Sequence, residues 1–155
     1  WVLGDDIDTD IIIPTEYLAL KTIEDMKQYG FSPLRPELAG QIKPGDIIVA
    51  GKNFGCGSSR EQAPEVIKAL GIPCIIAKSF ARIFYRNALN NGLLLLEQPE
   101  LHDVVKEGDT ITVTVNEDVE YNGKKYPIAS LPENLMEIIE AGGLVKAMRK
   151  RNGLD

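Results

Sequence analysis

A glycine-rich turn between a predicted strand and a predicted helix constrains this chain more than any other feature. The turn, Gly51-Lys-Asn-Phe-Gly-Cys-Gly57, follows the apolar run Ile47–Ala50 and precedes Glu65–Leu70, a helical segment that ends at Gly71. Backbone N–H groups at the start of a helix lack partners within the helix and carry partial positive charge, so they attract anions. Glycines allow a ligand to approach the backbone closely. The arrangement therefore predicts an anion-binding site.

The side chains that follow the turn indicate which anion would bind. Ser58, Ser59 and Arg60 offer two hydroxyls and a guanidinium, which binds carboxylates and phosphates in a two-pronged geometry. Pro64 lacks an N–H group and so belongs in the first turn of the helix, which places Ser59 and Arg60 at its positive end. Ser59 with Gln62, or Ser58 with Glu61, also fits a capping box, in which case the glycines would serve only the turn. Both interpretations stay open on spacing alone.

The middle of the chain alternates strands and helices. We expect strands at Ile47–Ala50, Cys74–Ala77 and Leu93–Leu96, separated by the helix that contains Glu65–Leu70 and by an amphipathic helix over Ser79–Asn90. The buried side of the second helix would carry Phe80, Ile83, Phe84 and Leu89. This order predicts parallel strands with helices covering the sheet.

The later part of the chain has a different pattern. The segment Asp109–Val115 alternates apolar and polar residues and predicts a half-buried strand, and Asn122-Gly123 predicts a hairpin turn. A last helix is expected over Leu135–Ala141, with Gly142-Gly143 ending it. The sequence pattern therefore predicts an α/β domain with a mixed parallel and antiparallel sheet.

The N-terminal part gives weaker signals. Ile11–Ile13 precedes Pro14 and predicts a short strand or strand end, because residues before proline avoid the helical conformation. A short helix is expected from Thr22 to Tyr29, ending at Gly30. The prolines and glycines between 31 and 44 predict a connector.

Length and composition indicate one globular domain over residues 1–155. The chain is 44% apolar and 26% charged, which is ordinary for a folded protein. No apolar run approaches the roughly 20 residues of a membrane span, and a net charge of −6 argues against a nucleic-acid partner. The basic run 146–151 predicts a solvated helix end. Because the chain begins at Trp1 rather than Met, we expect further residues upstream.

The two cysteines indicate neither a metal site nor a disulfide framework. Cys56 and Cys74 are far apart in the sequence and form no CxxC motif, which fits a reducing, cytoplasmic compartment. Cys74 is expected in the core, and Cys56 is expected to be accessible. His102, which is the single histidine, lies in a polar stretch, so we expect it at the surface and give little weight to a catalytic Cys–His pair.

Four segments, in order along nearly the whole chain, resemble a known family. Asn53-Phe-Gly-Cys-Gly-Ser-Ser-Arg-Glu61 is similar to the motif of 3-isopropylmalate dehydratase small subunits, which also marks the swivelling domain of aconitases and homoaconitase small subunits. Gly4–Pro14, Ala77–Leu93 and Glu140–Leu144 resemble the family's other segments. The chain departs from the family at Gln62, where the family commonly has His.

The resemblance implies a fold and a reaction. The fold would be the swivelling β/β/α domain, with three layers, that closes over a partner's active site. The reaction would be dehydration and rehydration of a small dicarboxylate hydroxy acid, in leucine biosynthesis. A separate large subunit would carry a [4Fe–4S] cluster that acts as a Lewis acid. This chain would bind no metal or cofactor itself, because the cluster needs at least three cysteines. Whether the isolated chain forms a homo-oligomer stays open.

By the same resemblance, the residues after the glycine turn would perform the chemistry. Ser58 would be the catalytic base, acting as an alkoxide that the helix start, the loop N–H groups and Arg60 stabilise. Ser59, Arg60 and Gly57 would bind the substrate, with Cys56 supporting the site.

Two further segments would support this site. The acidic residues at positions 5, 6, 8 and 10 lack the glycine and the terminal glutamate of a calcium loop, and otherwise predict a solvated turn whose aspartates cap backbone N–H groups. By resemblance, Asp10 would orient Arg60 or another cation. Arg82 and Arg86 share a helical face and either form surface ion pairs or support the glycine loop and the subunit interface.

The segment Thr15–Thr22 matches a family loop that selects the substrate. In homoaconitase small subunits the loop carries an arginine that binds a distal carboxylate, and Ala19 and Leu20 stand there in this chain. Apolar residues suit an alkyl side group, because burying an unpaired carboxylate is costly. Lys21 offers a cation to a distal carboxylate, so a tricarboxylate substrate stays an alternative. The same segment also fits the start of a helix. The alternatives are thus a homoaconitase or dimethylmalate dehydratase small subunit, or an anion-binding module without catalysis.

Overall fold

The structure is a computed structural model, which describes residues 1–20, 22–57, 62–114 and 117–128. Several predicted features lie outside these residues: Lys21, Ser58, Ser59, Arg60, the helix expected over Leu135–Ala141, the family segment Glu140–Leu144 and the basic run 146–151.

The centre of the molecule is a parallel sheet. Strands β1 (Ile47–Ala50), β2 (Cys74–Ala77) and β3 (Leu94–Glu97) pair in the order β1-β2-β3. Helix α4 (Gln62–Ala69) connects the first two strands, and α5 (Arg82–Asn90) connects the last two. The predicted strand–helix–strand–helix–strand order is confirmed.

Both faces of this sheet are buried, because successive side chains of a strand point to opposite faces. Ile48, Ile75 and Leu95 pack with the helices α1 (Thr9–Ile12), α4 and α5 in one apolar core. Ile76 and Leu96 lie in a second core with residues of the antiparallel strands. A strand buried on both sides needs a continuous apolar run, and the three strand sequences are such runs apart from the exposed Glu97 at the end of β3.

The second core is closed by an antiparallel sheet of β4 (Thr112–Thr114), β5 (Asp118–Tyr121) and β6 (Lys124–Pro127). Its hairpin turns at Asn122 and Gly123 as predicted, and their φ values of 51° and 79° fit a type I′ turn. Val119 and Tyr126 pack from this sheet against the parallel strands.

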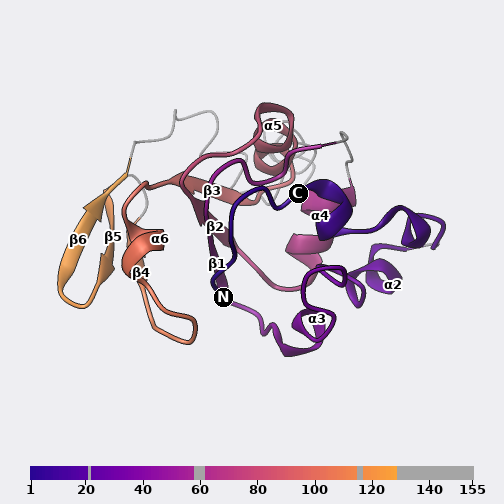
Figure 1. Cartoon of the computed structure of the whole chain (residues 1–155), viewed down its shortest axis with the longest axis horizontal. Helices are drawn as coiled ribbons and strands as arrows, with labels where there is room; N and C mark the ends of the chain where they lie inside the picture. Colours follow the sequence, from indigo (N-terminus) through magenta and orange to yellow (C-terminus); the bar gives the residue numbers. More distant parts are fainter. Residues whose placement is uncertain (21, 58–61, 115–116, 129–155) are drawn as a thin grey trace, which may run out of the picture.

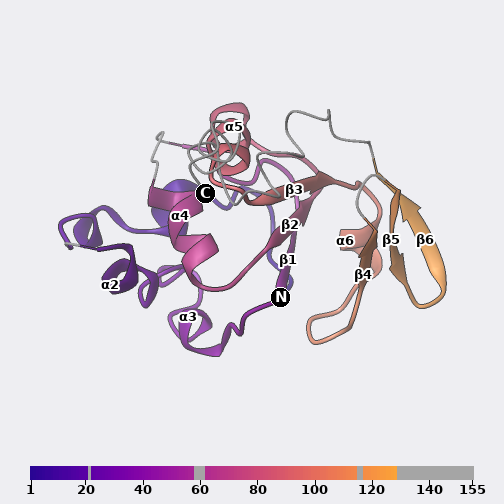
Figure 2. The ribbon, with the colours of Figure 1, turned by 180° about the vertical axis from the view of Figure 1, so that it is seen from behind.

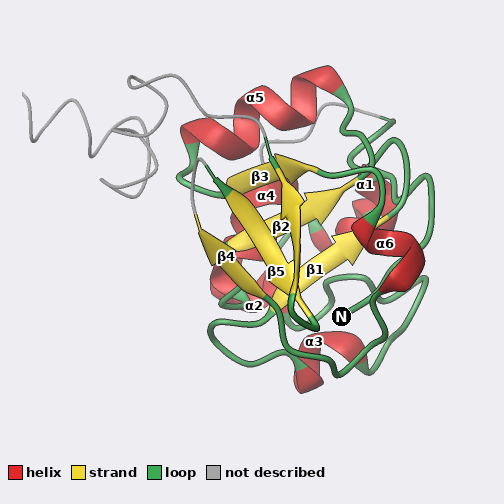
Figure 3. Ribbon diagram, turned by 90° about the vertical axis from the view of Figure 1, so that its left-hand side faces the viewer, coloured by secondary structure: helices red, strands yellow, loops and turns green. Residues whose placement is uncertain are grey.

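Figure 1 shows the three layers side by side, with β4–β6 on the left, β1–β3 in the middle and α2 (Ile23–Lys27) and α4 on the right. Figure 2 shows the same order from behind. In Figure 3 the antiparallel strands lie in front of the parallel strands, with α5 along the top. The predicted α/β fold with three layers is confirmed, and among the described residues the parallel and antiparallel strands form two sheets rather than one mixed sheet.

The strand predicted at Ile11–Ile13 is wrong. Residues Thr9–Ile12 form the short helix α1, because the Asp8 side chain caps it by accepting a hydrogen bond from the Ile11 N–H at 2.8 Å. An N-cap of this kind overrides the strand preference of consecutive isoleucines. Ile12 and Ile13 are fully buried, so the apolar run still serves the core.

The remaining short elements follow their local signals. After the 3₁₀ turn η1 (Thr15–Tyr17), helix α2 (Ile23–Lys27) lies within the predicted range Thr22 to Tyr29, and the Thr22 side chain caps it. The connector after residue 31 contains one helical turn, α3 (Leu38–Gln41), which was not predicted. A further short helix is α6 (Leu101–Val104).

Helix α5 begins later than predicted. Phe80 forms a parallel bridge with Phe54, so Ser79 and Phe80 are extended and the helix starts at Arg82. Ile83 was expected on the buried side but is 58% exposed, whereas Phe84, Ala88 and Leu89 are buried.

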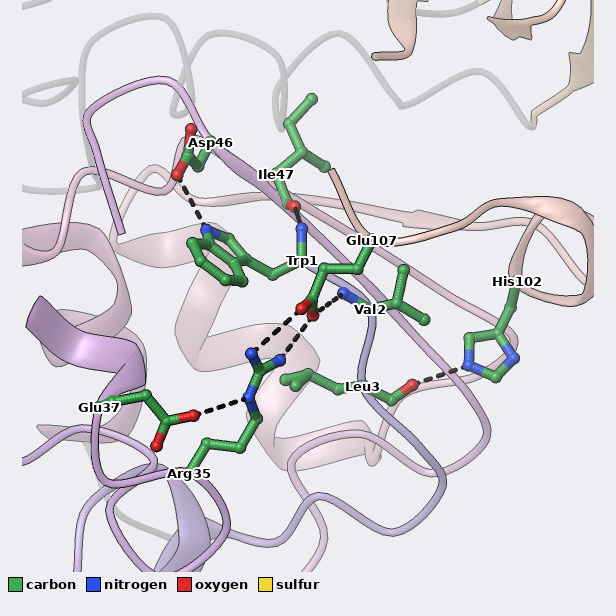
Figure 4. Close-up of polar contacts among 9 residues, drawn as sticks. All are labelled: Trp1, Val2, Leu3, Arg35, Glu37, Asp46, Ile47, His102 and Glu107. Carbon is green, nitrogen blue, oxygen red and sulfur yellow. Dashed lines mark hydrogen bonds and ion pairs between the residues drawn. The ribbon is translucent and has the colours of Figure 1, made fainter. Parts of the chain in front are cut away.

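Residues 1–4 run beside the edge strand β1. Val2 forms a parallel bridge with Val49, and the carbonyl of Leu3 lies 2.7 Å from Nε2 of His102 in α6. His102 is therefore half-buried and not the surface residue that was predicted. Figure 4 shows this contact beside the Arg35 guanidinium, which is bound to both carboxylate oxygens of Glu107, at 2.5 and 3.1 Å. Within the described residues, no helix has the length and apolar character needed to cross a membrane.

Candidate active site

The three longest predicted motifs meet at one edge of the parallel sheet. The glycine turn 51–57 leaves the end of β1, residues 78–81 leave the end of β2, and residues 4–9 continue the N-terminal segment that runs parallel to β1. Parallel neighbours end at the same edge of a sheet, so segments far apart in the sequence become adjacent there. The glycine turn lies between the other two segments.

Hydrogen bonds fix the turn to residues 5–9. The Asp5 carboxylate accepts from the Lys52 N–H at 2.7 Å, and the Asn53 side-chain amide donates to Asp6 at 3.1 Å. Backbone bonds continue this contact, because the Gly55 N–H donates to the Ile7 carbonyl at 2.7 Å and the Thr9 N–H donates to the Cys56 carbonyl at 2.9 Å. Asp5 therefore caps a backbone N–H group of the turn, as the sequence predicts for the acidic cluster, whereas Asp6 binds the Asn53 side chain.

Residues 78–81 fix the turn from the other side. The Asn53 N–H donates to Oγ of Ser79 at 2.8 Å, and the Phe54 N–H donates to the Ser79 carbonyl at 3.1 Å. The Ala81 N–H in turn donates to the Phe54 carbonyl at 2.9 Å. Ser79 thus contacts two consecutive residues of the turn.

Two of the turn's glycines are required by close contacts. A Cβ atom on Gly51 would lie 1.8 Å from Oδ1 of Asp5, and one on Gly55 would lie 2.2 Å from Cγ of Phe84. A Cβ atom on Gly57 would make only ordinary van der Waals contact, with Asp8 at 3.4 Å and Thr9 at 3.6 Å, but the φ of 92° at Gly57 falls in the left-handed region that other residues rarely adopt. The glycines therefore allow a close approach of three chain segments.

An aromatic cluster anchors the turn in the core. Phe54 is fully buried, and its ring packs edge-to-face on Phe84 and Phe80 with centroids 5.4 and 6.1 Å away. Such pairs contribute about 0.5–1.5 kcal/mol beyond the burial of their area. Phe54 therefore ties the turn to α5 from inside the molecule.

Neither cysteine lies in surroundings that favour its thiolate form. Burial, followed by the nearby carboxylates of Asp8 and Asp6, raises the pKa of the half-buried Cys56 above its usual value. Cys74 lies in the core as predicted, where desolvation raises its pKa to about 12. Among the residues that the structure describes, no group of three or more His, Cys, Asp or Glu side chains could hold a metal ion.

The predicted specificity segment forms a tight turn before α2. Ala19 is exposed, whereas Leu20 is half-buried and packs against the core on the helix side. Asp10 lies in α1 and accepts a hydrogen bond from the Thr15 hydroxyl at 3.2 Å, so the start of this segment is tied to α1.

The remaining predicted site residues stand as follows. Arg82 is the first residue of α5 and its side chain is exposed, which fits either of its predicted roles. Residues 58–61 lie outside the described chain, so the roles of Ser58, Ser59 and Arg60, and the contact between Asp10 and Arg60, stay predictions. Pro64 is buried near the start of α4, in agreement with its predicted position.

Sequence reasoning missed the residues that position the turn. Ser79 was assigned to the helix, and Asn53 received no role. The positive φ of Asn53, at 62°, gives a partial signal, since asparagine tolerates this conformation better than most residues. The contact between Ser79 and Asn53 joins positions 26 residues apart, and no local pattern predicts such a contact.

Comparisons with known proteins identify the family of this chain. The model of the aconitase C-terminal domain matches residues 16–101. The chain is 81% identical to the 3-isopropylmalate dehydratase small subunit of Lachnospira eligens, over 100% of this chain and 94% of the relative. It is 47% identical to the isopropylmalate/citramalate isomerase small subunit of Methanocaldococcus jannaschii, over 97% of this chain and 92% of the relative.

A solved structure shows the same fold. The crystal structure of 3-isopropylmalate dehydratase from Methanocaldococcus jannaschii superposes with a TM-score of 0.91 at 41% identity, covering 99% of this chain and 92% of that one. Sequence and fold agree over nearly the full length of the chains compared. The chain belongs to the family of 3-isopropylmalate dehydratase small subunits.

Proposed function

We propose that this chain provides the base and the carboxylate-binding residues of a hydro-lyase that interconverts 2-isopropylmalate and 3-isopropylmalate. The observation that carries the proposal is the glycine turn, which is fixed on both sides by residues 5–9 and 78–81 and leads directly into Ser58, Ser59 and Arg60. A rigid turn of this kind holds catalytic groups in place before substrate binds, and such preorganisation lowers the barrier of a charged transition state.

Ser58 would remove the proton from the carbon next to the departing hydroxyl group. A serine hydroxyl is a weak acid, so its alkoxide needs strong stabilisation by hydrogen-bond donors and positive charge. The N–H groups of the turn, the start of α4 and the Arg60 guanidinium would provide it. Ser59, Arg60 and Gly57 would hold a substrate carboxylate, and Arg60 would do so with two parallel hydrogen bonds.

The partner would be a large subunit that carries the iron–sulfur cluster. The cysteines of this chain do not fit a cluster, since Cys74 is enclosed in β2 and Cys56 is the single cysteine of the turn. We therefore assign the [4Fe–4S] cluster to that subunit. The two cysteines are also free thiols, which supports a reducing, cytoplasmic location.

The exposed Ala19 and the neighbouring Leu20 support an alkyl-substituted malate as the substrate. Ala19 presents a methyl group, and Leu20 is held against the apolar core behind it. A distal carboxylate would lack a cation at this position. The relative from Methanocaldococcus jannaschii is named for both isopropylmalate and citramalate, so a smaller alkyl group is a second candidate for this chain.

Steady-state rates of the chain mixed with its large subunit test this proposal. We expect turnover of 2-isopropylmalate and citramalate and little turnover of homoaconitate. Ala19→Arg should raise the relative rate for homoaconitate about ten- to hundredfold, which corresponds to about 1.5–3 kcal/mol of charge-assisted hydrogen bonding. The proposed substrate would be contradicted if the unmodified complex turned over homoaconitate efficiently and Lys21→Ala abolished that activity. Lys21 would then be the residue that binds the distal carboxylate of a tricarboxylate substrate.

A further inference from the structure

The rings of Tyr17 and Tyr29 stack face to face beside the specificity turn, which comprises residues 15–20. Their centroids lie 4.0 Å apart and their planes differ by 2°. Tyr17 is the last residue of η1, and Tyr29 follows the end of α2. Both rings are half-buried and pack against the core on the helix side.

The specificity turn depends on the position of Tyr17. The Leu18 N–H donates to the Thr15 carbonyl at 3.1 Å, and the Leu20 N–H donates to the Tyr17 carbonyl at 3.2 Å. The side chains of Leu18 and Leu20 pack against the same core as the tyrosines, and Ala19 between them is exposed. Tyr17 therefore sets the direction in which Ala19 is presented.

Tyr29 is held from the opposite side. Its N–H donates to the carbonyl of the buried Met26 at 2.9 Å, and the Phe31 N–H donates to the Ile12 carbonyl at 3.0 Å. The Tyr29 ring thus belongs to a segment that is fixed to the core by its own backbone. Because the Tyr29 ring stacks on the Tyr17 ring, it restrains Tyr17 and with it the specificity turn.

We propose that Tyr29 is a positioning residue for substrate selection, which holds the turn that presents Ala19 and Leu20 through its stack on Tyr17. The inference rests on the proposed function, in which these residues meet the variable side group of the substrate. Tyr29 lies outside the turn and acts on the substrate through Tyr17. Its loss should therefore change which side group is accepted more than it changes the chemical step.

The test compares Tyr29→Leu with the conservative variant Tyr29→Phe in the complex with the large subunit. Tyr29→Leu should raise the KM for 2-isopropylmalate about tenfold and change kcat less than about threefold, because the turn contributes to binding and not to proton transfer. The preference for 2-isopropylmalate over citramalate, as a ratio of kcat/KM, should change about three- to tenfold. Tyr29→Phe keeps the stacked ring and should restore both values to within about twofold of the unmodified complex.

Tyr126→Leu is the matched control. Tyr126 is buried in β6, in the core on the other side of the parallel sheet, and has no contact with the specificity turn. This variant should lower the melting temperature and leave KM and the substrate preference unchanged. An equal change of KM and preference in Tyr126→Leu and Tyr29→Leu would overturn the inference, because the effect would then reflect general destabilisation.

Hydrogen exchange of the isolated chain separates this inference from the proposed function. The amides of Leu18 and Leu20 should exchange about tenfold faster in Tyr29→Leu than in the unmodified chain or Tyr29→Phe, whatever substrate the complex uses. Faster exchange together with an inactive wild-type complex would support the positioning role and reject the proposed function. Unchanged exchange of both amides in Tyr29→Leu would overturn the inference even if the complex is active.

Discussion

Ser79 accepts a hydrogen bond from the Asn53 N–H through its Oγ, at 2.8 Å, and so joins the segment after β2 to the glycine turn. Asn53 has a φ of 62°, an uncommon conformation that other contacts must maintain. The Asn53 side chain is meanwhile bound to Asp6 from the opposite side. One residue of the turn is thus held by both neighbouring segments, a few positions before Ser58.

We predict that Ser79→Ala lowers activity more than stability. The Asn53 N–H is near solvent, so water replaces the lost acceptor and the free energy of unfolding falls by only about 1 kcal/mol. Displacement of the turn should lower kcat of the complex by about tenfold or more, because catalysis is sensitive to small errors of position. Ser79→Thr, which retains the hydroxyl, and Thr110→Ala, which removes an exposed hydroxyl before β4, should keep near-normal kcat. Equal rates in Ser79→Ala and Thr110→Ala would show that this hydrogen bond does not position the turn.

A set of glycine variants tests the close packing of the turn. Gly55→Ala adds a Cβ 2.2 Å from Phe84 Cγ at a φ of 85°, so overpacking and backbone strain should together lower the free energy of unfolding by about 2–5 kcal/mol. Gly123→Ala has a φ of 79° but open space around it, and should cost about 1–2 kcal/mol. Gly40→Ala in α3 meets neither obstacle and should be neutral or slightly stabilising. Urea unfolding of the three variants checks this order, and a Gly55→Ala no less stable than Gly123→Ala would contradict it.

The reactivity of Cys56 tests the electrostatics of the turn. Burial and the carboxylates of Asp8 and Asp6 raise the pKa of the thiol above its ordinary value of 9.0, so alkylation by iodoacetamide should have its midpoint above that pH. Asp8→Asn should lower the midpoint, because asparagine still caps α1 but carries no charge. Mass spectrometry after alkylation across a pH series measures both values. A midpoint below 9.0 would show that the turn favours the thiolate.

The ion pair between Arg35 and Glu107 should make the stability of the fold depend on pH in the acidic range. The hydrogen bond from Arg35 lowers the pKa of Glu107 below its ordinary value of 4.5, so the pair contributes stability above that pH, and the contribution is lost as the pH falls through the lowered value. Glu107→Gln should therefore lower the melting temperature at pH 7 by no more than about 2–4 °C, and should lower it less near pH 3. Thermal unfolding at both pH values measures this difference. A larger effect near pH 3 than at pH 7 would contradict the assigned sign.

The parts of the fold that the sequence predicted are those with a local signal. The apolar runs of β1 and β2 and the Asn122-Gly123 hairpin turn depend on neighbouring residues, and the structure confirms each of them. Helix α1 was missed because the Asp8 cap outweighs the strand preference of Ile11–Ile13.

The contacts that build the site could not be predicted in the same way. The stack of Tyr17 on Tyr29 and the bond from Asn53 to Ser79 depend on how separate segments pack, and no periodicity in the sequence specifies them. The motifs themselves predicted that the glycine turn is central. The structure gives the reason, because the three segments converge at one edge of the parallel sheet and the glycine turn lies between the other two.

The turnover of 2-isopropylmalate by the complex with the large subunit, compared between the unmodified chain and Ser58→Ala, tests the central claim most directly. We predict that the large subunit alone and this chain alone are inactive, that the mixture is active, and that Ser58→Ala lowers kcat by orders of magnitude while it still binds the large subunit. A Ser58→Ala complex with near-normal kcat would contradict the account, because the glycine turn would then hold the substrate without providing the base.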